Sequence, residues 1–216
     1  MRLLPWMNRQ RAFTIIELAV VVTIVALVIA FMIPALRKAK AKAQRITCVS
    51  HQACVGLAAR IYATDHGDLF PWQSTNVAGF VRVSYFTDPG PVLRSLSNEL
   101  STPKLLVCPA DTRRAALNWQ TLTRSNVSYF LSPDSAETLP QSILAGDRNV
   151  ATNRIRLGAG LVKVPPGAEM SWDATQHRFQ GNLCMGDGSI QQATSKRLSD
   201  HFQNSGLTNE TALVVP

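Results

Sequence analysis

One uninterrupted run of apolar residues dominates the beginning of the chain. Residues 15–33 contain a single charged side chain, Glu17. At about 1.5 Å per residue, a helix of this length rises about 28 Å, which is close to the hydrocarbon thickness of a bilayer. The apolar core of a cleaved secretory signal is shorter, about 7–15 residues. The run therefore predicts a membrane-spanning helix.

A helical pattern of apolar residues continues beyond this run. Its steps of three and four predict an amphipathic helix over residues 35–66 that packs on a globular domain. The stripe consists of Leu36, Ala39, Ala43, Ile46, Ala53 and Leu57. Pro34 lacks an amide hydrogen, so we expect a kink or a local opening of the helix there. Gly67 is a natural helix stop.

The remainder of the chain alternates apolar and polar residues in short runs broken by Pro, Gly and Asp, a pattern typical of strands. The predicted strands are 79–86, 105–108, 127–131, 143–145 and 161–164, and the predicted short helices are 91–100 and 195–203. Asp187-Gly188 between two β-prone runs favours a two-residue type I′ hairpin. The expected fold is α+β, with a long N-terminal helix packed on a mostly antiparallel β-sheet.

The net charge of +8, from 22 basic and 14 acidic residues, is explained by the same apolar run. Basic residues flank both of its ends: Arg2, Arg9 and Arg11 before it, and Arg37, Lys38, Lys40, Lys42 and Arg45 after it. Lipid headgroups favour charges in these places. We therefore expect a membrane, and not a nucleic acid, to be the partner of these charges.

Glu17 stands close to the end of the predicted span. A carboxylate at the centre of a spanning helix costs about 2.5–3.5 kcal/mol on insertion scales, and less near the interface. A helix that serves only as an anchor would insert more favourably without this carboxylate. The position of Glu17 therefore predicts a partner group in an assembly.

The segment Arg11-Ala12-Phe13-Thr14-Ile15-Ile16-Glu17, followed by the apolar run and Pro34, resembles the type III signal of type IV pilins and type II secretion pseudopilins. The resemblance implies that a prepilin peptidase/N-methyltransferase cuts between Ala12 and Phe13 and methylates Phe13. It also implies that Glu17 meets the N-terminal amine of a neighbouring subunit. Ala12 departs from the usual Gly of the family but keeps the small size.

This resemblance sets the expected organisation of the chain. A leader of residues 1–12 stays in the cytoplasm, residues 13–34 span the bacterial inner membrane, residues 35–66 continue the helix, and residues 67–216 form a globular domain outside the cytoplasm. The arginines of the leader agree with this orientation under the positive-inside rule, whereas the basic residues after the span oppose it. The processing motif decides between the two.

A second resemblance involves the later part of the chain. His177, nine residues and then Asp187-Gly188 resemble the H-x9-DG motif of a large group of bacterial prepilin-like proteins. Three further segments resemble the same group: CVSHQACVGLAARIYATDHGDLFP at 48–71, LVCPAD at 106–111 and LAGDRN at 144–149.

Four cysteines, Cys48, Cys54, Cys108 and Cys184, lack the spacing of a zinc finger and allow three complete pairings. Six residues of helix separate Cys48 from Cys54 by about 9 Å, beyond the roughly 7 Å limit of a disulfide. Buried free thiols throughout are an alternative. The resembling proteins often have a Cys at the positions of Cys48 and Cys108, and this implies a Cys48–Cys108 disulfide with Cys54 and Cys184 free.

The sequence gives little indication of catalysis. His177 has no second His or Cys at ligand spacing, which favours a hydrogen-bonding structural role, and the turn accounts for Asp187. Asp65 and Asp68 cannot supply the 6–8 oxygens that calcium usually takes. Motifs of nucleotide-binding and hydrolytic enzymes are missing. We expect no metal, no cofactor and no catalytic residue.

These observations predict a non-enzymatic structural subunit of a pilus, a pseudopilus or a type II secretion-like machine. Its partners would be the peptidase, the inner membrane and other pilin-like subunits, contacted through the N-terminal helices. One alternative is a membrane-anchored extracytoplasmic domain that binds a ligand and does not polymerise. Another is an anchored enzyme that uses His177 with Asp147 or Asp187.

Overall fold

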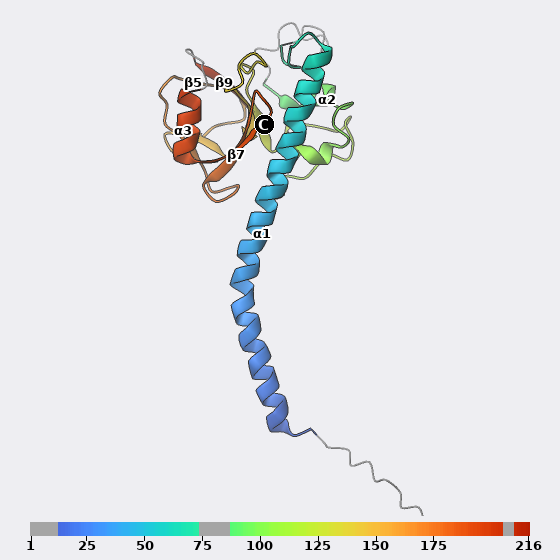
Figure 1. Cartoon of the computed structure of the whole chain (residues 1–216), viewed down its shortest axis with the longest axis vertical. Helices are drawn as coiled ribbons and strands as arrows, with labels where there is room; N and C mark the ends of the chain where they lie inside the picture. Colours follow the sequence, from blue (N-terminus) through green and yellow to red (C-terminus); the bar gives the residue numbers. More distant parts are fainter. Residues whose placement is uncertain (1–12, 74–86, 205–209) are drawn as a thin grey trace, which may run out of the picture. The chain divides into compact units, whose positions relative to one another are not determined.

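The computed structural model of the chain describes residues 13–73, 87–204 and 210–216. It contains two compact units, residues 1–42 and residues 43–216. Helix α1 (Ile15–Asp65) contributes to both, and the other helices and all strands belong to the second unit (Figure 1).

The first unit consists of the beginning of α1. This part of the helix is long and apolar enough to cross a membrane, and its apolar side chains are exposed. The helix continues through Pro34, so Pro34 does not end it, and a kink there stays a prediction. At its other end α1 stops at Asp65, and Gly67 has a φ of +70°. The predicted glycine stop is therefore confirmed, since this backbone region suits glycine.

The second unit contains two short α-helices, two 3₁₀ helices and nine strands among its described residues. The helices are α2 (Pro89–Ser95), η1 (Pro103–Leu106), η2 (Arg124–Asn126) and α3 (Ser195–Gln203). The strands are β1 (Tyr129–Leu131), β2 (Ile143–Asp147), β3 (Val150–Thr152), β4 (Ile155–Arg156), β5 (Gly160–Val164), β6 (Met170–Trp172), β7 (Gln180–Met185), β8 (Ile190–Thr194) and β9 (Thr211–Val215).

These strands form a six-stranded sheet of order β5-β9-β1-β2-β7-β8 and a three-stranded sheet of order β4-β3-β6. Every described pairing is antiparallel. The last strand, β9, lies inside the large sheet, with Leu161 of β5 and Leu131 of β1 both opposite Val214.

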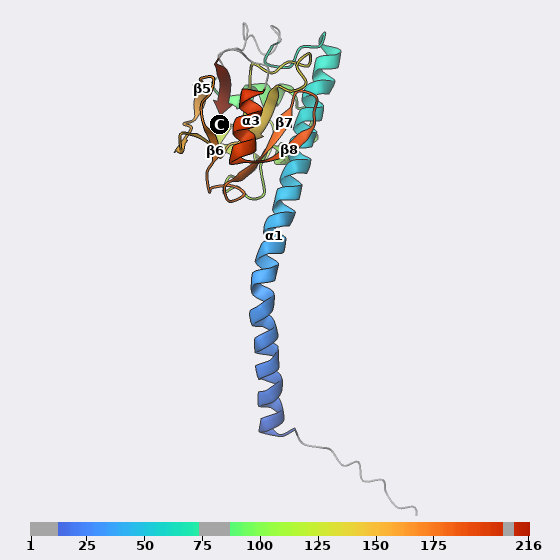
Figure 2. The ribbon, with the colours of Figure 1, turned by 60° about the vertical axis from the view of Figure 1, so that its left-hand side comes forward.

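Each face of the large sheet has its own hydrophobic core, because successive side chains of a strand point to opposite faces. Residues 43–65 of α1 cover one face, and Leu131 and Cys184 point toward them. Helix α3 and the small sheet cover the other face, where Phe130, Leu183 and Met185 are buried (Figure 2). The predicted α+β fold, a long helix on a mostly antiparallel sheet, is thus confirmed. Cys184 faces away from its two neighbours, as the alternation predicts.

The face of α1 that packs on the sheet differs from the predicted stripe. Ile46 and Leu57 are 56% and 59% exposed. The buried positions of the helix are instead Cys48, Gln52, Val55, Gly56, Ala58, Ala59, Tyr62 and Ala63. Small side chains on this face let the sheet approach closely. A Cβ atom at Gly56 would lie 2.5 Å from Sγ of Cys184, so close approach, and not the size of the apolar side chains, selects the face.

Several predicted elements occur where expected and others do not. Helix α3 has the predicted bounds, and β2 and β5 contain their predicted strands. The strand predicted over 105–108 is wrong, because Thr102 caps a 3₁₀ turn that begins at Pro103. The helix predicted over 91–100 begins earlier, at the Asp88 cap, and ends at Ser95. The strand predicted over 79–86 lies outside the described residues.

The β7–β8 hairpin is present, but its turn is not the predicted type I′. Gly188 has a φ of +82°, whereas Asp187 does not have a positive φ. The Gly188 amide donates to the Met185 carbonyl, and the Met185 amide donates to the Ser189 carbonyl, each at 2.9 Å. This pattern fits a type I turn followed by a glycine bulge, a three-residue loop. The loop therefore consists of Gly186, Asp187 and Gly188, one residue more than the predicted Asp187-Gly188 turn.

The close approach at Gly56 gives a stability prediction. We expect Gly56→Val to destabilise the protein by about 1–3 kcal/mol, because the added carbons meet the buried Cys184 sulfur. Replacing Cys184 by Ala in the same chain should recover part of the loss. Urea denaturation of the detergent-solubilised chain, followed by tryptophan fluorescence, measures both effects. Leu57→Val, at the exposed neighbouring position, is the control, and equal stabilities of the Gly56 and Leu57 variants would contradict the prediction.

Candidate functional site

The first candidate site is the start of α1. Thr14 precedes the helix, and its amide and hydroxyl groups both donate to Oε2 of Glu17 at 2.9 Å. The Glu17 amide in turn lies 3.3 Å from Oγ1 of Thr14. This is a capping box, in which two side chains satisfy amides that the first helical turn leaves free. Phe13 is exposed, and Ala12 lies outside the described residues.

The capping box gives Glu17 a role within its own helix that the sequence analysis did not consider. A Gln at this position can make the same cap, since the motif accepts either residue. The negative charge of Glu17 is therefore not needed for the cap. The predicted pairing with the amine of another subunit stays a prediction, and the two roles can be separated by experiment.

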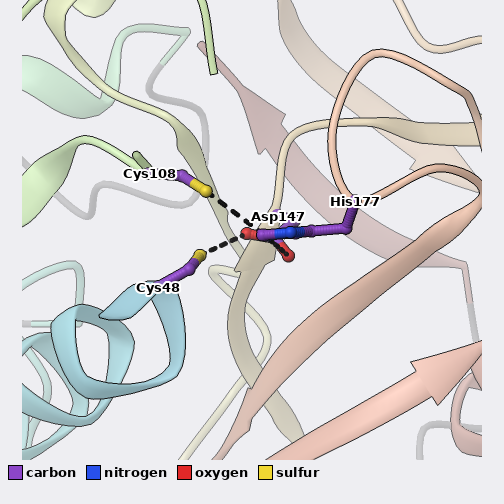
Figure 3. Close-up of side chains that lie close together, drawn as sticks. All are labelled: Cys48, Cys108, Asp147 and His177. Carbon is purple, nitrogen blue, oxygen red and sulfur yellow. Dashed lines mark hydrogen bonds and ion pairs between the residues drawn. The ribbon is translucent and has the colours of Figure 1, made fainter. Parts of the chain in front are cut away.

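The second candidate site is a cluster of four side chains buried in the second unit. Cys48, Cys108, Asp147 and His177 each direct one potential ligand atom to a common point, and these atoms all lie within 4.8 Å of one another (Figure 3). The Cys48 thiol donates to Oδ1 of Asp147 at 3.2 Å. Sγ of Cys108 is 3.2 Å from Nε2 of His177, and the same nitrogen is 3.6 Å from Oδ2 of Asp147.

Four separate elements supply these side chains. Cys48 is on α1, Cys108 follows η1, Asp147 ends β2, and His177 lies in the loop between β6 and β7. That loop has an unusual backbone. His177 and the next two residues, Arg178 and Phe179, have φ values of +46°, +52° and +61°. Non-glycine residues seldom adopt this region, so surrounding contacts must hold the loop in place.

Asn149 makes the principal contacts that hold the His177 loop. Its Nδ2 group donates to the carbonyls of Asp173, Gln176 and Gln180 at 3.1, 3.0 and 3.2 Å. Because Asn149 follows Asp147 by two residues, one short segment positions both the carboxylate and the imidazole of the cluster.

The Asp147 carboxylate is fully buried and accepts hydrogen bonds from two elements. Gln52 on α1 donates to Oδ1 at 2.9 Å. The backbone amide and the side-chain amide of Asn182 on β7 donate to Oδ2 at 2.8 and 3.1 Å. Nε of Arg45 lies 3.5 Å from Oδ1 of Asn182 and so places a positive charge near the cluster.

A buried ion pair between Arg148 and Asp111 lies beside the segments that carry the cluster. Arg148 donates to both oxygens of Asp111, from Nε at 2.7 Å and from Nη2 at 2.6 Å. The Ser128 hydroxyl and the Gln176 side chain also donate to Oδ2 of Asp111, at 2.7 and 3.0 Å. Asp111 and Arg148 belong to the segments that carry Cys108 and Asp147, so this pair fixes the two segments against each other.

The surroundings change the acidity of every group in the cluster. Burial raises the pKa of Asp147 to about 7, and a charged Cys108 adds to the rise. Proximity of the Cys48 sulfur lowers the pKa of Cys108 to about 5, with help from His177, and the nearby Cys108 raises the pKa of Cys48. Burial opposes protonation of His177, but the Cys108 hydrogen bond and the Asp147 charge outweigh it and raise its pKa. The directions of these shifts favour the charged forms of Cys108 and His177.

This arrangement is not that of a catalytic triad. In a triad, the nucleophile and the carboxylate contact different nitrogens of the histidine, so that the carboxylate orients the ring for proton transfer. Here Cys108 and Asp147 face the same nitrogen, Nε2. Both thiols are also fully buried. Two sulfurs, one nitrogen and one carboxylate oxygen within 4.8 Å of one another could instead hold a metal ion.

The structure joins some of the residues named from the sequence and separates others. His177 lies beside Cys108, Cys48 and Asp147, whereas Asp187 and Gly188 form the β7–β8 turn and contact Arg60. All four cysteines are free thiols in the structure, with Cys48 and Cys108 in the same cluster. The Cys48–Cys108 disulfide stays a prediction.

Sequence reasoning missed the cluster as a unit. It treated His177 as isolated, because no second ligand lies near it along the chain. A signal was nevertheless present. Each of the three resembling segments at 48–71, 106–111 and 144–149 contributes one cluster residue, and the H-x9-DG segment contributes the fourth.

Comparison with known proteins gives one match. Residues 7–33 match the family model described as the prokaryotic N-terminal methylation motif, which supports a type IV pilin-like protein with a prepilin-type signal. No curated protein and no solved structure matches the chain.

Loss of Asn149 should loosen the loop that carries His177. We expect Asn149→Ala to destabilise the protein by about 1–3 kcal/mol, because buried carbonyls lose their donor. Amide hydrogen exchange over residues 173–180 should accelerate, as measured by mass spectrometry on the full chain. Asn204→Ala, at an exposed position after α3, is the control. Unchanged exchange in this loop would show that other contacts hold His177.

Proposed function

We propose that the chain is a prepilin-like structural subunit that is processed at its N-terminus and assembled into a pilus, a pseudopilus or a type II secretion-like machine. The observation that carries the proposal is the methylation motif at residues 7–33. It coincides with a helix that is long and apolar enough to cross a membrane. A prepilin-type signal supports a structural pilin rather than an enzyme.

The proposed processing follows from the same motif. A prepilin peptidase/N-methyltransferase cuts between Ala12 and Phe13, and residues 1–12 are the cytoplasmic leader. Residues 13–34 anchor the subunit in the inner membrane, residues 35–66 continue the helix, and residues 67–216 lie outside the cytoplasm. Helix α1 begins at Ile15, and Phe13, the residue after the proposed cut, is exposed in front of it. The H-x9-DG group is the proposed family.

Helix α1 offers a surface for packing against other subunits. In the second unit Ile46, Leu57 and Ile61 are 56%, 59% and 43% exposed. The spacing of these residues, eleven and then four, places them on one face of the helix, opposite to the buried Cys48 and Gln52. A subunit that remained alone would gain nothing from this exposed apolar face. It supports assembly through helices of other pilin-like subunits.

Glu17 acts at the moment of assembly in this proposal. The carboxylate pairs with the N-methylated amine of Phe13 in a neighbouring subunit, and the capping box holds it at the start of α1 until then. A membrane-anchored ligand-binding domain would need neither the cut nor the pairing. The chemical state of the mature N-terminus therefore separates these two functions.

The first test is the mature N-terminus. We expect the chain from membranes of a host with a prepilin peptidase to begin at Phe13 and to carry one methyl group. Intact-mass and N-terminal peptide mass spectrometry measure both features. The same chain expressed without the peptidase is the control and should keep residues 1–12. Retention of residues 1–12 with an active peptidase present would contradict the proposed function.

The second test separates the charge of Glu17 from its cap. We expect Glu17→Gln to insert in the membrane and keep the capping box but to assemble poorly, because the partner amine loses its counter-ion. Thr14→Val is the matched variant, since it weakens the cap and keeps the charge, and it should assemble. Cross-linking of subunits in membranes measures the oligomers. Wild-type levels of oligomer for Glu17→Gln would remove the pairing role and leave the cap as the role of Glu17.

A further inference from the structure

We propose that Cys48, Cys108, Asp147 and His177 bind one thiophilic divalent cation of the Zn²⁺ class, in a tetrahedral structural site. The proposal is independent of processing and assembly, because it concerns residues 43–216 alone. It assigns a function to the buried cluster that neither the methylation motif nor the sequence pattern indicates.

The distances within the cluster fit this coordination. With metal–sulfur and metal–nitrogen bonds of about 2.3 and 2.0–2.1 Å, the ligand atoms of a tetrahedral site lie about 3.3–3.8 Å apart. Sγ of Cys48 is 3.2 Å from Oδ1 of Asp147, Sγ of Cys108 is 3.2 Å from Nε2 of His177, and the same nitrogen is 3.6 Å from the other oxygen of Asp147, Oδ2. All the ligand atoms lie within 4.8 Å. Movements of about an ångström, within reach of side-chain rotation, complete the tetrahedron.

The chemistry of the donors selects the cation. Two sulfurs, one imidazole nitrogen and one carboxylate oxygen suit Zn²⁺, whereas Ca²⁺ and Mg²⁺ take oxygen ligands in larger number. Four protein ligands also fill the coordination sphere. No position is left for water or substrate, and the thiols are buried. A closed site of this kind stabilises a fold and does not catalyse a reaction.

The candidate ligands already have hydrogen-bond partners that orient them. Gln52 and Asn182 orient the Asp147 carboxylate, and the Ala110 amide donates to Sγ of Cys108 at 3.4 Å. The Tyr129 hydroxyl lies 3.6 Å from Sγ of Cys48. Such partners orient the ligands of metal sites and adjust their basicity.

The charges around the cluster are compatible with a bound cation. Two thiolates and a carboxylate with one divalent ion leave a single negative charge, and Arg45 lies close enough to balance it. A disulfide would use both sulfurs and leave the fully buried Asp147 with His177 as its nearest ionisable partner. The two states exclude each other, because each consumes the same two thiols.

The test uses the full chain, extracted from membranes in detergent. Elemental analysis should find about one zinc per chain. After removal of the metal under reducing conditions, Co²⁺ should bind one per chain and give thiolate charge-transfer absorption with the intense d–d bands of tetrahedral cobalt. Zinc should displace it. We expect Cys48→Ser or Cys108→Ser to halve the charge-transfer band per ion or to abolish binding.

Two variants provide the controls. Cys54→Ser changes a cysteine of the same helix outside the cluster and should leave zinc content and the cobalt spectrum unchanged. Asn182→Ala removes a hydrogen bond to Asp147 without removing a ligand and should weaken zinc affinity by about 10–100-fold. Where a ligand variant fails to fold, zinc content and the cobalt spectrum of the unmodified chain decide alone.

Three results would overturn the proposal. The first is absence of cobalt or zinc binding by the reduced, folded chain. The second is octahedral cobalt without thiolate absorption, which would place the ion elsewhere. The third is a Cys48–Cys108 disulfide in metal-free protein as extracted, found by non-reducing peptide mapping. That result would instead support the pairing implied by the resembling sequences.

Discussion

The globular unit is organised around one fully buried carboxylate, that of Asp147. A charge in this environment is unfavourable unless hydrogen bonds or an opposite charge compensate it, and removing a partner from a buried ion typically costs about 3–5 kcal/mol. Gln52 of α1, Asn182 of β7, Cys48 and His177 all meet this requirement at once. This one side chain therefore connects α1, β7 and the β6–β7 loop to β2.

The chain uses two carboxylates in opposite ways. Glu17 is exposed and holds its own helix start through donors that another group can replace. Asp147 is enclosed by donors from separate elements that cannot leave without opening the core. The first arrangement suits a contact that is exchanged during assembly, and the second suits contacts that persist in the folded protein. Under the proposed function, the contacts of Asp147 hold the globular unit to the same helix whose beginning is inserted in the membrane.

Sequence patterns predicted the elements whose cause is local. Helix α3 has its predicted bounds, the end of α1 follows from Gly67, and the facing of Cys184 follows from strand alternation. The packing face of α1 could not be predicted, because Gly56 is buried only through the close approach of Cys184, a partner distant in the sequence. The cluster could not be predicted from the sequence for the same reason. Each of its four residues lies tens of positions from the next, and only the sheet and the Asn149 contacts bring His177 to Asp147.

The position of β9 constrains the order in which the domain can form. This strand follows all the others in the chain, yet it lies between β5 and β1, and all five of its residues are buried. Strand β5 has no other neighbour in the described sheet. Under the proposed function, the domain emerges progressively on the far side of a membrane, so β5 stays unpaired and the edge of β1 stays open until β9 has been translocated. Such contacts between distant residues slow folding and expose strand edges to other chains. In the interval before β9 arrives, the open edges of β5 and β1 can pair with other chains.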